Sequence, residues 1–312
     1  MSVLEDVISP PTAGLEPRGA GQRERWSRRL PLLPALIFTI VVTQVPFLVT
    51  LWYSFQSYFW NEPGGAHWTG ISNYKEVFTD PNFRSALWRS VTMTAIAVIV
   101  AMLLGIALAV LLDKKFLGRG IVRTLIITPF LVMPAAAALI WSGPMLDPNF
   151  GLLNWLLEPF GVNHVAWLTT HAYGSVIVVM IWQWTPFMTL IVLAGLQGQA
   201  SDVLEAAKVD GANAWATFRE LTLPHLRPYI ELGVLLGSIY LVTAFDQVRL
   251  MTNGGPGTTT TTLPFYLYQT VNYAFDIGGS AAAGVVTVIL TLIVASFALR
   301  MFASVFQFEE AK

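Results

Sequence analysis

The chain lacks cysteine altogether and carries little charge. Without cysteine it has no disulfide, thiolate metal site, iron–sulfur cluster or cysteine nucleophile. Only 12% of its 312 residues are charged, compared with roughly 25% in soluble domains. The net charge of -1 gives no reason to expect nucleic-acid binding. Because 54% of the residues are hydrophobic and gather in long blocks, we expect an all-α integral membrane protein.

Sequence signatures of catalysis are missing as well. There is no G-x-x-x-x-G-K-[ST] nucleotide loop and no H-E-x-x-H pair. Charged residues do not recur inside several apolar segments, as they usually do in proton- or sodium-coupled carriers. We therefore expect no enzymatic activity, no catalytic or metal-binding residue and no cofactor, and we expect the driving energy to come from another protein.

Six apolar segments are predicted to span the membrane. A bilayer core of about 30 Å requires about 20 such residues per helix. The segments are Leu30–Phe55, Ser90–Leu112, Thr124–Ser142, Ala172–Ser201, Pro228–Leu250 and Ile277–Leu299. Pro129 and Pro134 in the third segment and Pro186 in the fourth predict kinks or breaks, which membrane helices tolerate.

The basic residues predict the orientation. Most of them fall on one side of the six segments: Arg18, Arg23, Arg25, Arg28, Arg29, Lys114, Lys115, Arg119, Arg123, Lys208, Arg219, Arg227, Arg300 and Lys312. The positive-inside rule then puts both termini in the cytoplasm. We expect a disordered cytoplasmic tail over residues 1–29, a transmembrane domain over 30–303 and a cytoplasmic tail over 304–312.

The segment between the fourth and fifth predicted helices reads SDVLEAAKVDGANAWATFRELTLPHLRP from Ser201. Ser201 is a suitable N-cap, and Gly211 is a suitable helix stop. A second helical piece is predicted over Ala212–Leu221, ending at Pro224. Two short helices bent at a glycine would form a rigid projection; the alternative is an amphipathic helix lying on the bilayer.

The spacing in this segment resembles the EAA loop of ABC-importer permeases, in particular their sugar-type, maltose-like branch. The matching positions are Glu205-Ala206-Ala207, Gly211, Leu221 and Leu223-Pro224, with Leu221 standing where isoleucine is more frequent. Trp184-Thr185-Pro186-Phe187 and Thr252-Asn253-Gly254-Gly255-Pro256 match two further motifs of that branch. The resemblance extends over residues 30–303.

The resemblance implies a coupling role for the loop over residues 201–224. Glu205 would contact a cytoplasmic ATPase, Ala206 and Ala207 would permit a close fit, and Gly211 would make the bend; Leu223 and Pro224 complete the motif.

The same resemblance implies a set of partners and a location. The partners would be a second, homologous permease, two ATP-binding subunits and an extracytoplasmic solute-binding protein, in a bacterial inner membrane. Residues 263–269 and 275–278 resemble the sugar-alcohol permeases, so the solute would be a sugar or a polyol.

Candidate substrate contacts lie on two helices. Trp182, Gln183 and Trp184 lie near the middle of the fourth predicted helix, where an amide and indoles can bind hydroxyls and stack on a sugar. The alternative is that Gln183 bonds to a neighbouring helix and that the indoles only pack.

The fifth predicted helix offers Tyr240, Thr243, Asp246 and Gln247 at i+3 and i+4 spacing. An intramembrane acid such as Asp246 is a functional candidate, although Arg249 could neutralise it in a structural ion pair.

Two extracytoplasmic segments and one competing function remain. Gly151–Phe160 is predicted to form a short interfacial helix. Thr252–Leu263 would face the solute-binding protein, or would simply be a mobile Gly/Thr loop. The competing function is an ion-coupled secondary carrier acting without an ATPase, whose uptake an uncoupler would abolish at constant ATP.

Overall fold

The computed structural model describes residues 32–162 and 164–310, and the chain divides into two compact units, residues 1–49 and 50–312. The predicted tail over residues 1–29 lies outside the described residues. Helix α2 (Leu33–Tyr53) is apolar along its whole length and contains Pro46. Inside this helix the Thr43 hydroxyl donates to the Thr39 carbonyl at 2.7 Å, so this hydroxyl has a hydrogen-bond partner within its own helix.

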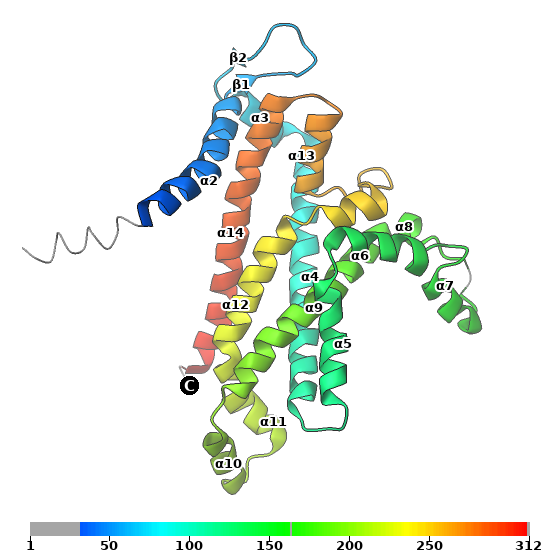
Figure 1. The fold of residues 1–312 in the computed structure, drawn as a ribbon, viewed down its shortest axis with the longest axis vertical. Helices are drawn as coiled ribbons and strands as arrows, with labels where there is room; N and C mark the ends of the chain where they lie inside the picture. The colour runs from blue at the N-terminus through cyan, green and yellow to red at the C-terminus, as the bar shows by residue number, and fades with distance from the viewer. Residues whose placement is uncertain (1–31, 163, 311–312) are drawn as a thin grey trace, which may run out of the picture. The chain divides into compact units, whose positions relative to one another are not determined.

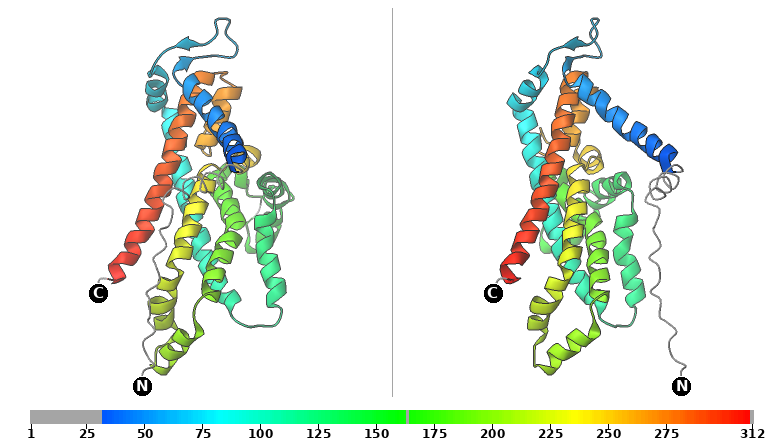
Figure 2. Two further views of the ribbon diagram at one scale, coloured as in Figure 1. Left: turned by 60° about the vertical axis from the view of Figure 1, so that its left-hand side comes forward. Right: turned by 90° about the vertical axis from the view of Figure 1, so that its left-hand side faces the viewer.

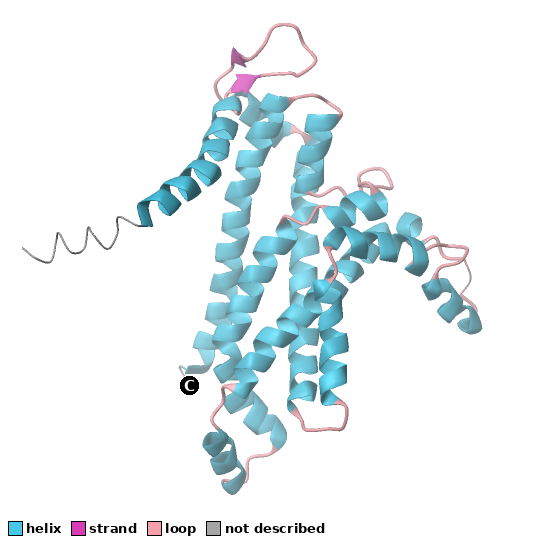
Figure 3. Ribbon diagram, in the orientation of Figure 1, coloured by secondary structure: helices cyan, strands magenta, loops and turns pink. Residues whose placement is uncertain are grey.

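The described residues of the second unit are mostly helical, and their strands form one antiparallel pair of two residues each (Figures 1 and 3). Its elements are β1 (Gln56–Ser57), β2 (His67–Trp68), α3 (Ser72–Thr79), α4 (Pro81–Asp113), α5 (Arg119–Leu131), α6 (Pro134–Ile140), the π-helical η2 (Trp141–Met145), α7 (Leu152–Leu157), the 3-10 turn η3 (Glu158–Phe160), α8 (Trp167–Thr170), α9 (Ala172–Gln197), α10 (Ser201–Val209), α11 (Ala214–Thr217), the π-helical η4 (Phe218–Thr222), α12 (Leu223–Val242), the π-helical η5 (Val248–Thr252), α13 (Leu263–Asn272) and α14 (Ile277–Glu310). The predicted all-α class is therefore confirmed.

The core of this unit lies between α4, α9 and α12. Helices α4 and α9 pack along much of their length, and α12 contacts both of them as well as α14. Met93, Met188 and Leu226 are fully buried in this core. At Gly105 the backbone of α4 comes so near α9 that a Cβ there would lie 2.6 Å from the Met188 Cβ. Only glycine permits this helix–helix distance.

The count of six spanning helices is only partly supported. Among the described residues, four helices are long and apolar enough to cross a membrane: α2, α4, α9 and the Ile277–Phe297 part of α14. The pair formed by Arg119–Leu131 and Pro134–Met145 would make a fifth, but it bends by 100° at its break. Helix α12 has 20 residues and is not among them, since Arg227 and Glu231 make its first half polar.

Several predicted helix boundaries were wrong. The break in the third segment was indicated by its two prolines, and it lies between Leu131 and Pro134. The fifth helix begins at Leu223 instead of Pro228 and ends at Val242 instead of Leu250. Pro228 lies inside α12 and removes one backbone hydrogen bond there, a loss that membrane helices tolerate. Helix α14 continues to Glu310, past Leu299, where the sixth predicted segment ends.

The two ends of this unit carry different elements, and the views of Figures 1 and 2 agree on this. The loop between α4 and α5 and the α10–α11 segment lie at one end. Helices α3 and α13 and the β1–β2 pair lie at the other. Two of the basic clusters predicted to share one side, Lys114–Arg123 and Lys208–Arg227, therefore do lie at the same end.

We expect Gly105→Ala to loosen the α4–α9 contact and to destabilise the protein by about 1–3 kcal/mol, because its new methyl group meets a Cβ and backbone atoms. Thermal unfolding of the purified protein in detergent measures this. Gly174→Ala, on the exposed face of α9 with nothing within 4 Å of its Cβ, is the matched control and should not lower stability. Equal losses from both variants would contradict the close-contact role.

Candidate functional site: coupling loop and midplane contacts

The predicted coupling loop consists of two helices joined by a fixed bend. Helix α10 ends at Val209, and Gly211 follows its C-cap residue. Gly211 has φ +82°, a left-handed conformation that costs a non-glycine residue about 1–2 kcal/mol. The Gly211 N–H donates to the Lys208 carbonyl at 3.2 Å, and the Ala212 N–H donates to the Ala207 carbonyl at 2.9 Å. This pair of bonds is a Schellman motif. Asn213 then caps α11 by accepting from the Ala216 N–H at 2.8 Å, so the two helices and their bend form a rigid projection.

Three details of the loop differ from the prediction. The N-cap of α10 is Ala200, without a side-chain bond, and Ser201 is the first helical residue. Pro224 does not end a helix but lies in the first turn of α12, which continues from α11 through η4. Ala207 is buried within the chain, whereas Glu205 and Ala206 are exposed. Of the two alanines, only Ala206 has its side chain on the surface of the chain.

An aromatic cluster of Phe130, Trp184, Phe187 and Tyr240 joins the ends of α5 and α12 to the middle of α9. The Trp184 and Tyr240 ring centroids are 5.5 Å apart, and Phe130 stacks on Phe187 at 5.1 Å. Tyr240 stays exposed at its outer side. The sequence-predicted pair Trp184 and Tyr240 thus comes together, whereas Trp182 contacts Trp141 instead.

A chain of side-chain amides lies beside this cluster. Gln247 Nε2 donates to Gln183 Oε1 at 2.8 Å, and Gln183 Nε2 donates to the Val132 carbonyl at 2.8 Å. Both glutamines are buried, with exposed fractions of 3% for Gln183 and 2% for Gln247. In this conformation Gln183 therefore bonds to neighbouring elements, as the packing alternative predicted.

The remaining candidates of the fifth predicted helix flank its interruption. The chain leaves α12 after Val242, so the expected run of i+3 and i+4 neighbours is broken. Thr243 donates its hydroxyl to the Tyr240 carbonyl at 3.0 Å. Arg249 donates to Asn253 Oδ1 at 2.7 Å and lies over the Tyr268 ring. Within the part of the chain that is described, Arg249 forms no ion pair with Asp246, and the ion-pair alternative is wrong here.

The Thr252–Leu263 segment is a packed loop in this structure. Thr260 is fully buried, and its hydroxyl lies 2.7 Å from the Thr252 hydroxyl and donates to the Gly255 carbonyl at 3.0 Å. The Thr261 hydroxyl donates to the Gly254 carbonyl at 3.2 Å. These bonds fix the loop from inside and argue against a mobile one.

Two ionisable groups at the end of the unit that carries α3 and α13 have perturbed pKa values. Burial, together with a hydrogen bond from its hydroxyl to Asp80 Oδ2 at 2.7 Å, raises the pKa of Tyr266 well above its usual value. Burial also raises the pKa of Asp276, although this carboxylate accepts from the Gly279 N–H at 2.8 Å. Both groups tie α13 and the start of α14 to their surroundings, and neither belongs to the predicted site.

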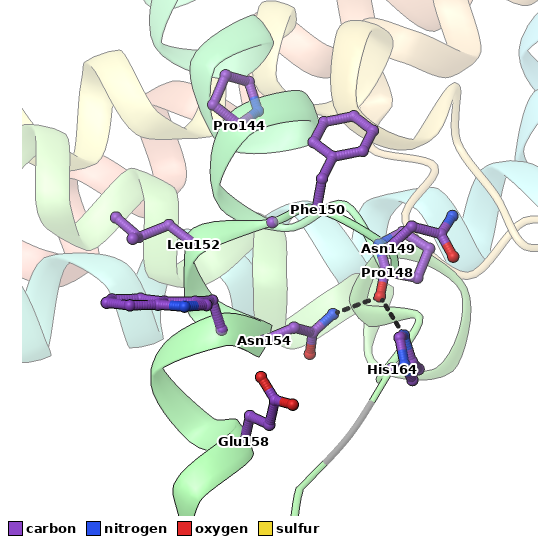
Figure 4. A pocket seen from close by; sticks show the side chains of 10 residues that line it. Pro144, Pro148, Asn149, Phe150, Leu152, Asn154, Glu158 and His164 are labelled. Carbon is purple, nitrogen blue, oxygen red and sulfur yellow. Dashed lines mark hydrogen bonds between the residues drawn. The ribbon is translucent and has the colours of Figure 1, made fainter.

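A hollow of 270 Å³ lies beside α7 (Figure 4). The predicted interfacial helix is confirmed as helical there by α7 and η3. Asn154 Nδ2 and His164 Nδ1 both lie within hydrogen-bond distance of the Pro148 carbonyl. None of the predicted substrate residues lines this hollow.

Sequence reasoning missed three groups that contact the predicted substrate residues or their aromatic cluster: Phe130, Trp141 and the Val132 carbonyl. The two prolines of the third segment were the available signal, since a helix break there frees backbone groups for side chains to bind. Nothing in the sequence indicated that Trp141 would face Trp182.

The model of a family described as "binding-protein-dependent transport system inner membrane component" matches residues 101–306. The chain belongs to this family. As a permease it resembles a probable ABC transporter permease of Sinorhizobium fredii, with 39% identity over 85% of this chain and 86% of the relative. It also resembles the trehalose/maltose transport system permease MalF of Thermococcus litoralis, with 32% identity over 86% and 91% of the two chains.

A solved structure agrees on the fold. The chain superposes on the structure of a bacterial alginate ABC transporter in complex with an alginate pentasaccharide-bound periplasmic protein, with a TM-score of 0.77, 20% identity and coverage of 91% of this chain and 96% of that one. The resemblance to ABC-importer permeases is therefore confirmed, and this permease is a multi-pass protein of the inner membrane.

We expect Thr260→Val in this permease to destabilise the Thr252–Leu263 loop by about 1–3 kcal/mol, because it removes the hydroxyl partner of Thr252 and of the Gly255 carbonyl. Hydrogen exchange of the loop amides should become faster. Thr258→Val is the control, since the Thr258 side chain is exposed, and it should leave exchange unchanged. Unchanged exchange in Thr260→Val would mean that these bonds do not hold the loop.

Proposed function

We propose that this permease forms, with a second and homologous permease, the membrane channel of an ATP-driven importer for a sugar or sugar alcohol. The observation that carries the substrate class is the similarity to a trehalose/maltose permease over 86% of this chain. A sulfoquinovosyl glycerol permease of Agrobacterium fabrum, 32% identical over 90% of this chain, adds a second carbohydrate-related relative. Both termini would lie in the cytoplasm, as the basic residues predict.

The coupling function is assigned to the loop over residues 201–224. Helix α10 projects with Glu205 and Ala206 exposed, and the Gly211 turn makes the projection stiff. Val209 and Trp215 add exposed apolar side chains to the same projection. An exposed acid, a small residue and apolar groups on a rigid support are suited to a protein cleft, and such a contact would transmit the closure of an ATPase dimer as a rigid-body movement.

Substrate contacts are assigned to the group around Trp184 and Tyr240. Trp184, exposed Tyr240, Thr243 and Asp246 combine ring faces with polar atoms at a point where α12 is interrupted. Interrupted helices commonly surround substrates in transporters because they offer free backbone groups. Ring faces stack on the apolar face of a sugar, while the hydroxyl and the carboxylate bind its hydroxyl groups. The other residues predicted to contact substrate, Trp182, Gln183 and Gln247, have partners within the chain in this conformation and are left out of this assignment.

The decisive experiment is to purify the permease in mild detergent and to identify the proteins that accompany it. We expect a second permease and a nucleotide-binding subunit, with ATPase activity that increases when a solute-loaded binding protein is added. Uptake into vesicles should require ATP and persist with an uncoupler. Uptake that the uncoupler abolishes at constant ATP would favour the secondary carrier and overturn the proposal.

The loop geometry also yields a test of docking. We expect Ala206→Trp to prevent binding of the ATPase subunit, because the indole occupies the space that the exposed alanine leaves to a partner. Lys208→Trp is the control. Lys208 lies two residues after Ala206, so its side chain is about 200° around the helix and faces the opposite side. Co-purification of the ATPase and the amount of permease in the membrane are measured. Equal loss of the ATPase in both variants would contradict this docking face.

A further inference from the structure

Three interrupted or kinked helices meet at the amide chain formed by Gln247, Gln183 and the Val132 carbonyl. Val132 follows the last residue of α5, where the chain turns by 100° into α6. Gln183 lies one turn before Pro186 in α9. Gln247 follows the interruption after Val242 and leads into η5. The two hydrogen bonds of this chain thus link three separate elements, two of them at breaks of the helix and the third within one turn of a proline.

The bonds tolerate little relative movement. Each is 2.8 Å long, and a donor–acceptor distance of 3.6 Å no longer counts as a hydrogen bond. With the side-chain rotamers kept, a displacement of α5 or η5 from α9 by about 1 Å along a bond therefore breaks that bond. Transport by alternating access moves groups of helices against each other by more than this.

The network is also incomplete in the conformation described. Gln247 Oε1 and Trp141 Nε1 are buried and have no hydrogen-bond partner among the described residues. Their elements are neighbours, since η2, which begins at Trp141, contacts η5. Buried polar atoms without partners raise the free energy of this conformation relative to one in which they are satisfied. The same amide pair that holds the three elements together thus leaves atoms ready for other partners.

We propose that the Gln247–Gln183 hydrogen bond is a latch, closed in this conformation and open in another conformation of the transport cycle. Gln183 and Gln247 are then positioning residues that set the balance between the two conformations, and not substrate ligands. The inference rests on the proposed transport function, because the hydrogen bond would open and close only if the helices move during a transport cycle.

A distance measurement tests the opening without changing the latch. Since the chain has no cysteine, spin labels can be attached to cysteines introduced at Leu131 and Leu250, which are exposed on either side of it. In the complete transporter, with reactive cysteines removed from its partners, the label distance should differ between the nucleotide-free and the ATP-bound state. Labels at Leu103 and Leu111, both exposed on α4, should keep one distance. An identical Leu131–Leu250 distribution in both states would overturn the proposal.

Substitutions test the positioning role. Gln183→Met and Gln247→Met keep the side-chain volume but remove the same bond, so each should change the ATPase rate of the transporter without binding protein by about fivefold, in the same direction. The double variant should resemble the single ones, and the KM of transport should stay within about twofold of the original. Gln197→Met, at the exposed end of α9, is the matched control and should change nothing.

Two outcomes would overturn the latch. A raised KM with an unchanged ATPase rate would make the glutamines substrate ligands. A lowered melting temperature with both kinetic quantities unchanged would make the bond purely structural. If the unaltered transporter does not couple ATP hydrolysis to uptake, the proposed function itself fails, and this control identifies that case before any variant is measured.

Discussion

The structure depends on one constraint: polar groups in an apolar interior must find partners within the protein. Regular helices meet it through their own backbone bonds, and their threonines return hydroxyls to carbonyls of the same helix, as Thr43 and Thr189 do. Where a helix breaks, side chains from other helices must supply the partners. Gln183 does so for the Val132 carbonyl. The break after α5 is therefore also a point where separate helices are bonded to each other.

The same constraint explains how far the sequence predicted the fold. The apolar runs that became α4, α9 and α14 were long and nearly free of charge, and such runs have few alternatives to a helix in this setting. The break near Pro129 and Pro134 had a local signal. The interruption between Val242 and η5 had none, since Thr243, Ala244 and Phe245 are neither glycine nor proline, and only tertiary packing decides it.

The sequence predicted which residues belong to the candidate site better than it predicted how those residues are arranged. Helical spacing assumed that Tyr240 and Gln247 share one continuous helix, but the interruption separates them and sends Gln247 to Gln183. Arg249 was expected near Asp246, yet a π-helical turn directs it to Asn253 and Tyr268. The coupling loop was predicted better because Gly211 and Asn213 act locally, through a turn conformation and a cap that neighbouring residues determine.

The predicted coupling loop and the contact between Trp184 and Tyr240 are connected by one stretch of helix. From Ala214 through η4 to Val242 the junction residues Phe218, Thr222 and Leu223 keep right-handed helical dihedrals, so α11, η4 and α12 form a continuous rod of about 40 Å. One end of the rod carries the Gly211 bend, and the other carries Tyr240 against Trp184. In the proposed function, a movement of the loop would be passed along this helix to the contact between Tyr240 and Trp184, and Gln247, which follows the interruption after Val242, would connect it to the amide chain.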